Sequence, residues 1–424
     1  MSVLNTDHYE LTMLSAALKD GSAARRCVFE VFARRLPVGR RYGVVAGTGR
    51  LVDLVRDFRF RDPDLDFLRD NRVVDAETLD WLAGYRFSGD IEGYAEGELF
   101  FPGSPILTVA GTFAECVLLE TLTLSVLNHD SAVASAAARM VTAARGRPLI
   151  EMGSRRAHEE AAVAAARAAY LAGFASTSNL AAGSRYGIPT AGTAAHAFTL
   201  LHDDEPAAFA SQVAALGKNT TLLVDTYDIS QGIRNAIAVA GPDLRAIRID
   251  SGDLSVLAQQ SRELLDSLGA VDTKIIVSGD LDEHAIAALA AEPVDSYGAG
   301  TAVVTGSGAP TAGLVYKLVE VDGRPVVKRS ERKATVGGRK TAVRRHKPTG
   351  TATEEIVVSQ GTPLRAPHDR LLQRPYLLAG DQAPDLPSLE DAREHLRQCL
   401  ISIPWEGLKL SHGEPAVPVL MQEG

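Results

Sequence analysis

Residues 246–268 read AIRIDSGDLSVLAQQSRELLDSL, and the fold prediction starts from this stretch. Its first residues are apolar except for Arg248, the loop DSGD follows, and the remainder has the apolar spacing that is typical of a helix. A strand, a short polar loop and a helix in this order belong to a βαβ unit. Repeated units of this kind build a parallel sheet.

The same pattern of strand, loop and helix recurs between residues 148 and 301. The segments between the candidate strands are alanine-rich and helical, for example residues 159–171. Six or seven such units in about 150 residues favour an α/β fold with an irregular (β/α) barrel, and a doubly wound sheet is the alternative. The candidate strands lie at residues 149–152, 188–191, 222–225, 246–249, 274–277 and 294–296.

The segments on either side of this pattern are predicted to form smaller structures. Residues 1–130 mix short strands with helices and are expected to make an N-terminal α/β domain, with the barrel at 131–325. Residues 326–424 contain many prolines and are expected to pack back on the N-terminal domain. The specific expectations are strands at 27–32, 91–95 and 106–109, a nearly continuous helix at 112–144, a hairpin around Asp322 and Gly323, and a solvated loop in the basic run 328–347.

The composition is that of a globular protein, because the 424 residues are 46% hydrophobic and 23% charged. The net charge of −9 argues against nucleic acid as the main ligand, and three widely spaced cysteines suggest a reducing compartment. The first residues, MSVLNTDHYELTM, do not fit a signal peptide, and no apolar run approaches the roughly 20 residues that span a membrane. We therefore expect a cytoplasmic protein without membrane or nucleic-acid partners.

Polar and small residues collect where the candidate strands end. The sequence Ser-Gly-Asp-Leu occurs at 251–254 and again at 278–281, and Gly-Ala-Gly-Thr follows the last strand. Main-chain N–H groups at such helix starts can bind phosphate, although Ser and Asp there can equally serve as helix caps. Three such loops, together with Arg155, Arg156 and Arg248, favour a phosphorylated ligand.

Three acidic residues at the strand ends, Asp225, Asp250 and Asp280, would repel a phosphate unless they bind Mg²⁺ or sugar hydroxyls. Phosphate, hydroxyl and metal sites together describe a phosphoribosyl ligand. His196 lies in the stretch GIPTAGTAAHAF (187–198), at the start of an expected helix. The sequence has no P-loop, no G-x-G-x-x-G after a first strand, no H-E-x-x-H and no Cys/His cluster, so hydride transfer on NAD and zinc hydrolysis are unsupported.

Seven motifs, taken together, resemble the nicotinate phosphoribosyltransferase family: TDHYELTM, EMGSRRAH, GFASTSN, GTAAHAF, IRIDSGDL, SGDLDE and YGAGT. The resemblance implies a type II phosphoribosyltransferase fold, an irregular α/β barrel with an N-terminal α/β domain, in a homodimer with shared active sites. It implies transfer of phosphoribosyl from phosphoribosyl pyrophosphate to nicotinate in NAD salvage, giving nicotinate mononucleotide and pyrophosphate. ATP hydrolysis would be coupled through a phosphohistidine, and Mg²⁺ would take part.

The resemblance also implies roles for individual residues. His196 matches the phosphorylated histidine, Tyr9 the aromatic residue that reaches the pyridine ring from the neighbouring subunit, and Phe174 its stacking partner. Arg248 and Asp250 match the ligand-binding pair. Asp225, Asp250 and Asp280 are the Mg²⁺ candidates, and Asp225 or Asp250 is expected to orient the imidazole. The other candidates are expected to bind phosphoribosyl pyrophosphate: Arg155 and Arg156 at the leaving group, and Thr193, Ser251, Gly252, Ser278, Gly279, Gly298, Gly300 and Thr301 around the sugar and phosphate.

Other functions stay open on the sequence alone. Relatives that use nicotinamide or quinolinate are alternatives, although the GTAAHAF segment favours nicotinate. A phosphate-binding barrel of the aldolase or isomerase type would need a Schiff-base lysine at a strand end, whereas Lys274 begins its strand. A non-catalytic metabolite sensor would have lost His196 or the paired aspartates, and all of them are present.

Overall fold

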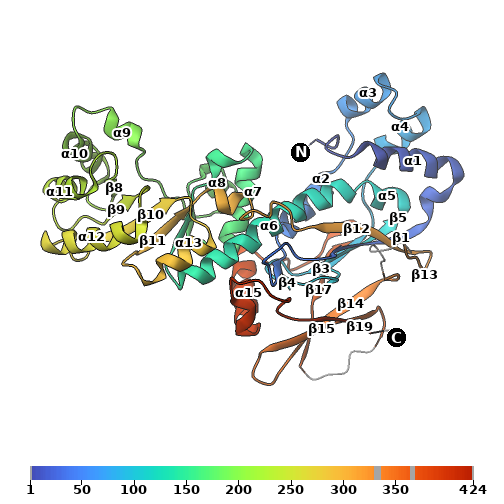
Figure 1. The fold of residues 1–424 in the computed structure, drawn as a ribbon. Helices are drawn as coiled ribbons and strands as arrows, with labels where there is room; N and C mark the ends of the chain where they lie inside the picture. Colours follow the sequence, from blue (N-terminus) through green and yellow to red (C-terminus); the bar gives the residue numbers. More distant parts are fainter. Residues whose placement is uncertain (1, 329–335, 363–367, 423–424) are drawn as a thin grey trace. The chain divides into compact units, whose positions relative to one another are not determined.

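The computed structural model describes residues 2–328, 336–362 and 368–422, which Figure 1 shows as a ribbon. The chain divides into two compact units. The first unit combines residues 1–132 with residues 309–424, and the second comprises residues 133–308. The boundary between residues 132 and 133 lies within the 25-residue helix α6 (Glu120–Ala144).

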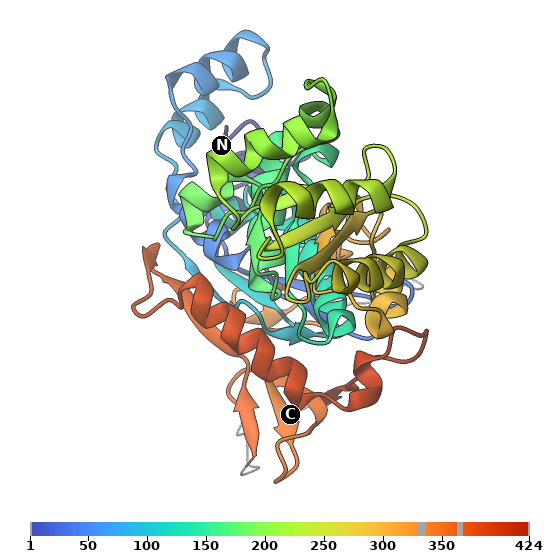
Figure 2. The ribbon, with the colours of Figure 1, turned by 90° about the vertical axis from the view of Figure 1, so that its left-hand side faces the viewer.

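A parallel six-stranded sheet forms the frame of the second unit, in the order β7-β6-β11-β10-β9-β8. Helices connect its strands, and Figure 2 shows several of them, green to yellow, in front of the sheet. Within the described residues no pairing joins β7 to β8, so the sheet is an open half-barrel. The strands are β6 (Leu149–Glu151), β7 (Ser176–Thr177), β8 (Thr221–Leu223), β9 (Ala246–Ile249), β10 (Lys274–Gly279) and β11 (Ser296–Ala299).

Aspartate side chains begin several helices of this unit, because they accept a hydrogen bond from an N–H group in the first turn. Asp204, Asp228 and Asp253 accept from the third residue after them at 2.8, 2.8 and 3.4 Å. The aspartate of the first Ser-Gly-Asp-Leu motif, Asp253, is therefore a helix cap. The helices are α7 (Glu159–Leu171), α8 (Leu180–Tyr186), α9 (His196–Leu200), α10 (Glu205–Leu216), α11 (Ile229–Ala240), α12 (Leu254–Ser267), α13 (Glu283–Ala288) and α14 (Thr301–Val304), with short 3₁₀ turns at Ser154–Arg156 and Leu289–Ala291.

The predicted α/β class with an irregular barrel is confirmed. The predicted strand at 294–296 is displaced, because β11 begins at Ser296 and contains residues 297–299, which were expected to form the loop after it. A second predicted strand is wrong. Residues 188–191 form only an isolated parallel bridge, between Thr190 and Thr177. Pro189 has no N–H group with which to continue a ladder, so the pairing ends there. The strand that belongs at this edge is β7, which contains only two residues.

A seven-stranded antiparallel sheet dominates the first unit, in the order β13-β12-β1-β5-β3-β17-β18. The apolar core lies against this sheet and includes the rings of Phe29 and Tyr316, which stack with their centroids 4.8 Å apart. The strands are β1 (Arg26–Ala33), β3 (Asp90–Tyr94), β5 (Leu107–Thr112), β12 (Leu314–Val321), β13 (Arg324–Pro325), β17 (Gln373–Leu378) and β18 (Asp381–Gln382). The helices are α1 (His8–Asp20), α2 (Thr48–Asp57), α3 (Asp62–Asp70), α4 (Ala76–Ala83), α5 (Phe113–Val117) and α15 (Leu389–Ser402), with 3₁₀ turns at Ser22–Ala24 and Trp405–Leu408.

The chain after residue 309 joins the N-terminal region in one unit. Strand β17 pairs with β3, and the predicted hairpin is confirmed, because Asp322 and Gly323 have φ of 48° and 74° between β12 and β13. The remaining strands are β14 (Lys340–His346), β15 (Ala352–Ser359), β16 (Asp369–Leu371) and β19 (Val419–Gln422), which form a second sheet, and the pair β2 (Gly43–Val44) and β4 (Leu99–Phe100).

The basic run at 328–347 is not the solvated loop that was predicted. Its later part is strand β14, in which Lys340 and Arg344 are buried, while residues 329–335 lie outside the described part of the chain. Lys340 donates to Glu30 at 2.8 Å, so each buried cation has an acidic partner far away in the sequence. These partners offset the cost of burying the charge.

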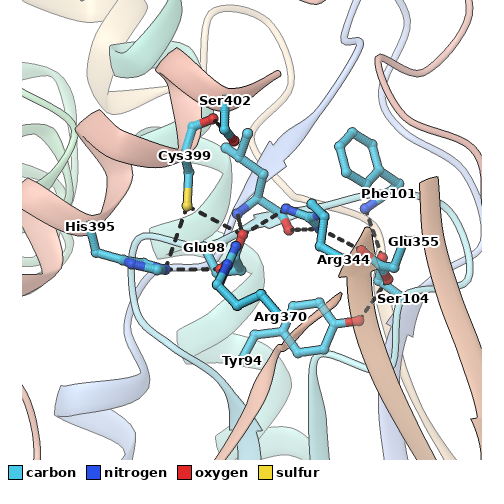
Figure 3. A network of polar contacts seen from close by, with 11 residues as sticks. Tyr94, Glu98, Phe101, Ser104, Arg344, Glu355, Arg370, His395, Cys399 and Ser402 are labelled. Atoms are coloured by element: carbon cyan, nitrogen blue, oxygen red, sulfur yellow. Dashed lines mark hydrogen bonds and ion pairs between the residues drawn. The ribbon is translucent and has the colours of Figure 1, made fainter. Parts of the chain in front are cut away.

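Arg344 is the centre of the polar network in Figure 3. Its guanidinium donates to Glu98 at 2.7 Å and to Glu355 at 2.5 Å, and all three side chains are fully buried. Burial by itself would raise the pKa of Glu98, but Arg344, His395 and Arg370 hold that pKa well below its usual range. The network therefore links strands β14, β15 and β16 and helix α15 to the residue before β4.

Replacing Arg344 with methionine should lower the free energy of unfolding by about 3–5 kcal/mol, because two buried carboxylates lose their shared cation. Urea unfolding followed by circular dichroism measures this change. The matched control is Arg397→Met, since Arg397 and its partner Glu394 lie on the exposed face of α15 and the midpoint should stay almost unchanged. Equal midpoints for the two variants would contradict the assigned role of Arg344.

Candidate active site

The strand-end loops of the second unit bring His196 and Asp225 together. The Nε2 atom of His196, the first residue of α9, lies 3.1 Å from Oδ1 of Asp225, which follows β8. The imidazole is 40% exposed, whereas the carboxylate is 1% exposed. No described residue contacts the other ring nitrogen, Nδ1, through a hydrogen bond. The ring is thus held on one side and open on the other.

The next loop fixes the carboxylate of Asp225. Its Oδ2 atom accepts the N–H of Asp250 at 2.9 Å and the hydroxyl of Ser251 at 2.7 Å. Both oxygens of Asp225 are therefore engaged by protein donors, and the carboxylate has a defined orientation. An acceptor placed in this way selects the tautomer of a histidine and orients its ring.

Arg248 points from β9 toward the same strand ends. Its Nη1 donates to the hydroxyl of Thr193, and its Nη2 lies 3.9 Å from Oδ1 of Asp250, which also accepts the hydroxyl of Ser278. Burial lowers the pKa of Arg248, and its Nε atom has no hydrogen-bond partner among the described residues. Arg248 is a partly buried cation that donates no hydrogen bond to a carboxylate in the described part of the chain, and such a group is suited to an anionic ligand.

The glycines of the predicted phosphate cradle have different structural roles. Gly279 has φ of 126°, and a Cβ there would lie 3.0 Å from the carbonyl oxygen of Asp250. Gly298 lies inside β11, where a Cβ would lie 2.8 Å from the Met152 sulfur, so strand packing explains this glycine. At Gly300 the nearest atom to a Cβ would be the Met152 carbonyl oxygen at 3.4 Å, so this position is less crowded. Gly279 is the position where a side chain would most directly disturb the strand ends.

The remaining predicted site residues lie on other elements or loops than His196, Asp225 and Arg248 do. Arg155 and Arg156 are exposed in the 3₁₀ turn after β6. Gly252 lies in the loop before α12, and Thr301 is the first residue of α14. Phe174 is fully buried, a location that does not favour stacking on a substrate. Tyr9 belongs to helix α1 of the other unit and is 43% exposed.

The three metal candidates do not converge. Asp225 is occupied by protein donors, Asp280 is exposed, and the one group of three potential ligands whose donor atoms lie within 4.8 Å, among the described residues, is Glu98, His395 and Cys399. The carboxylate of Glu98 already accepts from two arginines, and burial beside it raises the pKa of the Cys399 thiol. We therefore assign that group to the charge network of Figure 3 and not to a metal centre.

Sequence reasoning missed one buried acid at the strand ends, Glu151. It is the last residue of β6 and accepts hydrogen bonds from the N–H of Gly153 and from the hydroxyl of Thr177. The signal was present in the sequence, since Glu151 is an acid in an otherwise apolar strand, two residues before the Gly-Ser-Arg-Arg segment.

The chain matches two family models. The first is described as nicotinate phosphoribosyltransferase (NAPRTase) N-terminal domain and matches residues 4–128. The second is described as quinolinate phosphoribosyl transferase, C-terminal domain, and matches residues 133–307. Together they cover the N-terminal part of the first unit and nearly all of the second.

Known proteins resemble the chain over nearly its whole length. Nicotinate phosphoribosyltransferase pncB1 of Mycobacterium tuberculosis (strain H37Rv) is 63% identical over 425 residues, which covers 98% of this chain and 94% of the relative. The crystal structure of human nicotinic acid phosphoribosyltransferase has a TM-score of 0.88 at 28% identity and covers 98% and 97% of the two chains. Nicotinate-nucleotide pyrophosphorylase from Pyrococcus furiosus has a TM-score of 0.79 at 25% identity and covers 94% of both.

Proposed function

The chain belongs to the nicotinate phosphoribosyltransferase family, and we propose that its His196–Asp225 pair couples ATP hydrolysis to the family's reaction. As an enzyme of NAD salvage it transfers phosphoribosyl from phosphoribosyl pyrophosphate to nicotinate, forming nicotinate mononucleotide and pyrophosphate. The observation that carries the proposal is the contact of a partly exposed imidazole with a buried carboxylate at the strand ends.

The transfer itself needs groups that stabilise charge. When pyrophosphate leaves C1 of the ribose, the sugar becomes cation-like and the leaving oxygen becomes more negative. In this proposal Asp250 binds the ribose hydroxyls, because its Oδ2 atom has no hydrogen-bond partner among the described residues. Arg248, Arg155 and Arg156 bind the phosphate oxygens, and charged donors placed where negative charge develops lower the barrier.

The phosphohistidine step uses the open side of the ring. Nδ1 of His196 attacks the γ-phosphorus of ATP, the bond from that phosphorus to the bridging oxygen breaks, and ADP leaves. Nε2 keeps its proton, which it shares with Asp225, so the carboxylate stabilises the positive charge that the ring gains. Water later cleaves the phosphorus–nitrogen bond and releases phosphate.

Of the three predicted Mg²⁺ ligands, only Asp250 is suited to hold the ion. Asp250 offers a carboxylate oxygen to the ion, whereas Asp225 is engaged in orienting His196. Mg²⁺ usually binds one or two carboxylates together with substrate phosphates, so a single protein carboxylate is sufficient. When bound, the ion would supply positive charge beside the phosphates.

The active form in this proposal is a homodimer in the cytoplasm. Tyr9 is exposed on α1, which leaves its ring available to a neighbouring copy of the chain. The three cysteines are all free and buried, which is compatible with a reducing compartment. Among the described residues, none of the helices combines the length and apolarity needed to cross a bilayer.

The test is an assay of the purified protein with phosphoribosyl pyrophosphate and Mg²⁺, with nicotinate, nicotinamide or quinolinate supplied in turn, with and without ATP. We expect the protein to turn over nicotinate at a rate that ATP increases, and to turn over neither nicotinamide nor quinolinate. The match of residues 133–307 to a quinolinate-type model makes quinolinate the informative control. Turnover of nicotinamide or quinolinate in preference to nicotinate would overturn the substrate assignment.

A further inference from the structure

Glu151 is a buried acid of the second unit whose hydrogen bonds go to two strand-end loops. It is 1% exposed at the end of β6, and none of the described residues gives it a cationic partner. Burial raises its pKa, and hydrogen bonds from Thr177 and Gly153 partly offset this rise. A carboxyl group in such surroundings costs free energy unless it is hydrogen-bonded. The two hydrogen bonds of Glu151 are therefore the guide to its structural role.

The two contacts of Glu151 belong to different loops. Its Oε1 accepts the N–H of Gly153, which begins the turn that carries Arg155 and Arg156. Its Oε2 accepts the hydroxyl of Thr177 at 2.5 Å, at the end of the neighbouring strand β7. One carboxylate thus bridges the loops that follow β6 and β7.

Further bonds reinforce the bridge. The Thr177 hydroxyl accepts the N–H of Asn179 at 3.0 Å, and the side chain of Asn179 donates to the hydroxyl of Ser154 at 3.0 Å. Gly153 is packed so closely that a Cβ there would lie 2.1 Å from Val304 and 2.9 Å from the carbonyl oxygen of Gly300. The position of the loop after β6 is therefore coupled to the loop after β11.

We propose that Glu151 is a positioning residue for phosphoribosyl pyrophosphate: it holds the Gly153–Arg156 loop so that Arg155 and Arg156 face the pyrophosphate. The inference rests on the proposed function, because that function gives the two arginines their ligand. Glu151 does not contact the substrate in this proposal. It acts through the main chain of Gly153 and the hydroxyl of Thr177.

The test compares Glu151→Ala with Glu151→Gln in steady-state kinetics and in calorimetric binding of phosphoribosyl pyrophosphate alone. The alanine variant should raise the KM and the Kd for phosphoribosyl pyrophosphate roughly tenfold or more, because misplacing binding groups by about 1 Å has effects of this size. The KM for nicotinate should stay within about twofold of wild type. Glutamine can accept from Gly153 and donate to Thr177, so it should largely restore binding.

The matched control is Glu205→Ala, since Glu205 is also a buried carboxylate of the second unit but its side chain bonds to Asn235 on α11. It should leave both KM values near wild type. If Glu151→Ala does not fold, Thr177→Val carries the test, with an expected rise in the same Kd. An unchanged Kd, or equal effects on nicotinate and phosphoribosyl pyrophosphate, would overturn the role of Glu151. Failure of the proposed function is recognised separately, by a wild-type protein that does not turn over nicotinate.

Discussion

Replacing His196 with alanine should abolish ATP hydrolysis and the stimulation by ATP, while a slow ATP-independent synthesis of nicotinate mononucleotide remains. The reason is that the groups proposed for phosphoribosyl transfer, Arg248 and Asp250, do not depend on the imidazole for their position. Incubation of the wild-type protein with radiolabelled ATP and Mg²⁺ should place an acid-labile, base-stable phosphate on His196. Mass spectrometry of the labelled peptide identifies the residue.

Loss of the Asp225 carboxylate should impair the phosphorylation step nearly as much as loss of the His196 imidazole itself. Asp225→Asn keeps the shape of the side chain but removes the charge that faces Nε2, so the rate of labelling should fall by roughly 10²–10⁴-fold. Because Nε2 is held by Asp225, the phosphate should be found on Nδ1, which is distinguished from the other isomer by phosphorus NMR.

The control for this prediction is His202→Ala. His202 also belongs to the segment around α9, but its Nδ1 lies 2.8 Å from the carbonyl oxygen of Phe198 and makes no contact with Asp225. Its removal should leave the labelling intact. If ATP still stimulates the His196→Ala variant by the wild-type ratio, the phosphohistidine assignment is wrong.

Much of the second unit could be predicted because its strands are short apolar runs followed by polar loops. Strand β9 has the predicted bounds, and the loops after β8 and β9 meet as expected. Strand β7 contains two residues, which are too few for a recognisable period. Residues 188–191 are apolar enough to be predicted as a strand, but Pro189 has no N–H group, and only an isolated bridge forms beside it, at Thr190.

Pairings between distant residues could not be predicted from local patterns. Arg344 appeared as one more charge in a basic run, since its partners Glu98 and Glu355 lie on other strands. Glu151 was missed for the same reason, because its importance depends on Thr177. By contrast, the sequence left Asp225 and Asp250 open as the partner of His196, and the geometry selects Asp225.

Replacing Gly279 with alanine should raise the KM for phosphoribosyl pyrophosphate roughly tenfold or more, with a smaller effect on nicotinate. Gly279 is the last residue of β10 and has φ of 126°. Holding a residue with a side chain in this backbone conformation costs about 1–3 kcal/mol. The new Cβ would also lie 3.0 Å from the carbonyl oxygen of Asp250, so the main chain there must shift. That shift moves a carboxylate which accepts from Ser278 and faces Arg248, and the ligand-binding groups lose their alignment.

Gly269→Ala separates this effect from backbone strain alone. Gly269 has φ of 78°, lies before β10 at the opposite end of the strand, and a Cβ there would have no atom within 4 Å. It should therefore lower the melting temperature, though by less than Gly279→Ala because the new Cβ meets no other atom, and leave the KM for phosphoribosyl pyrophosphate unchanged. If both variants bind phosphoribosyl pyrophosphate as wild type does, the ends of β9 and β10 are not its binding site. If both lose binding equally, strain in the fold and not the contact with Asp250 is responsible.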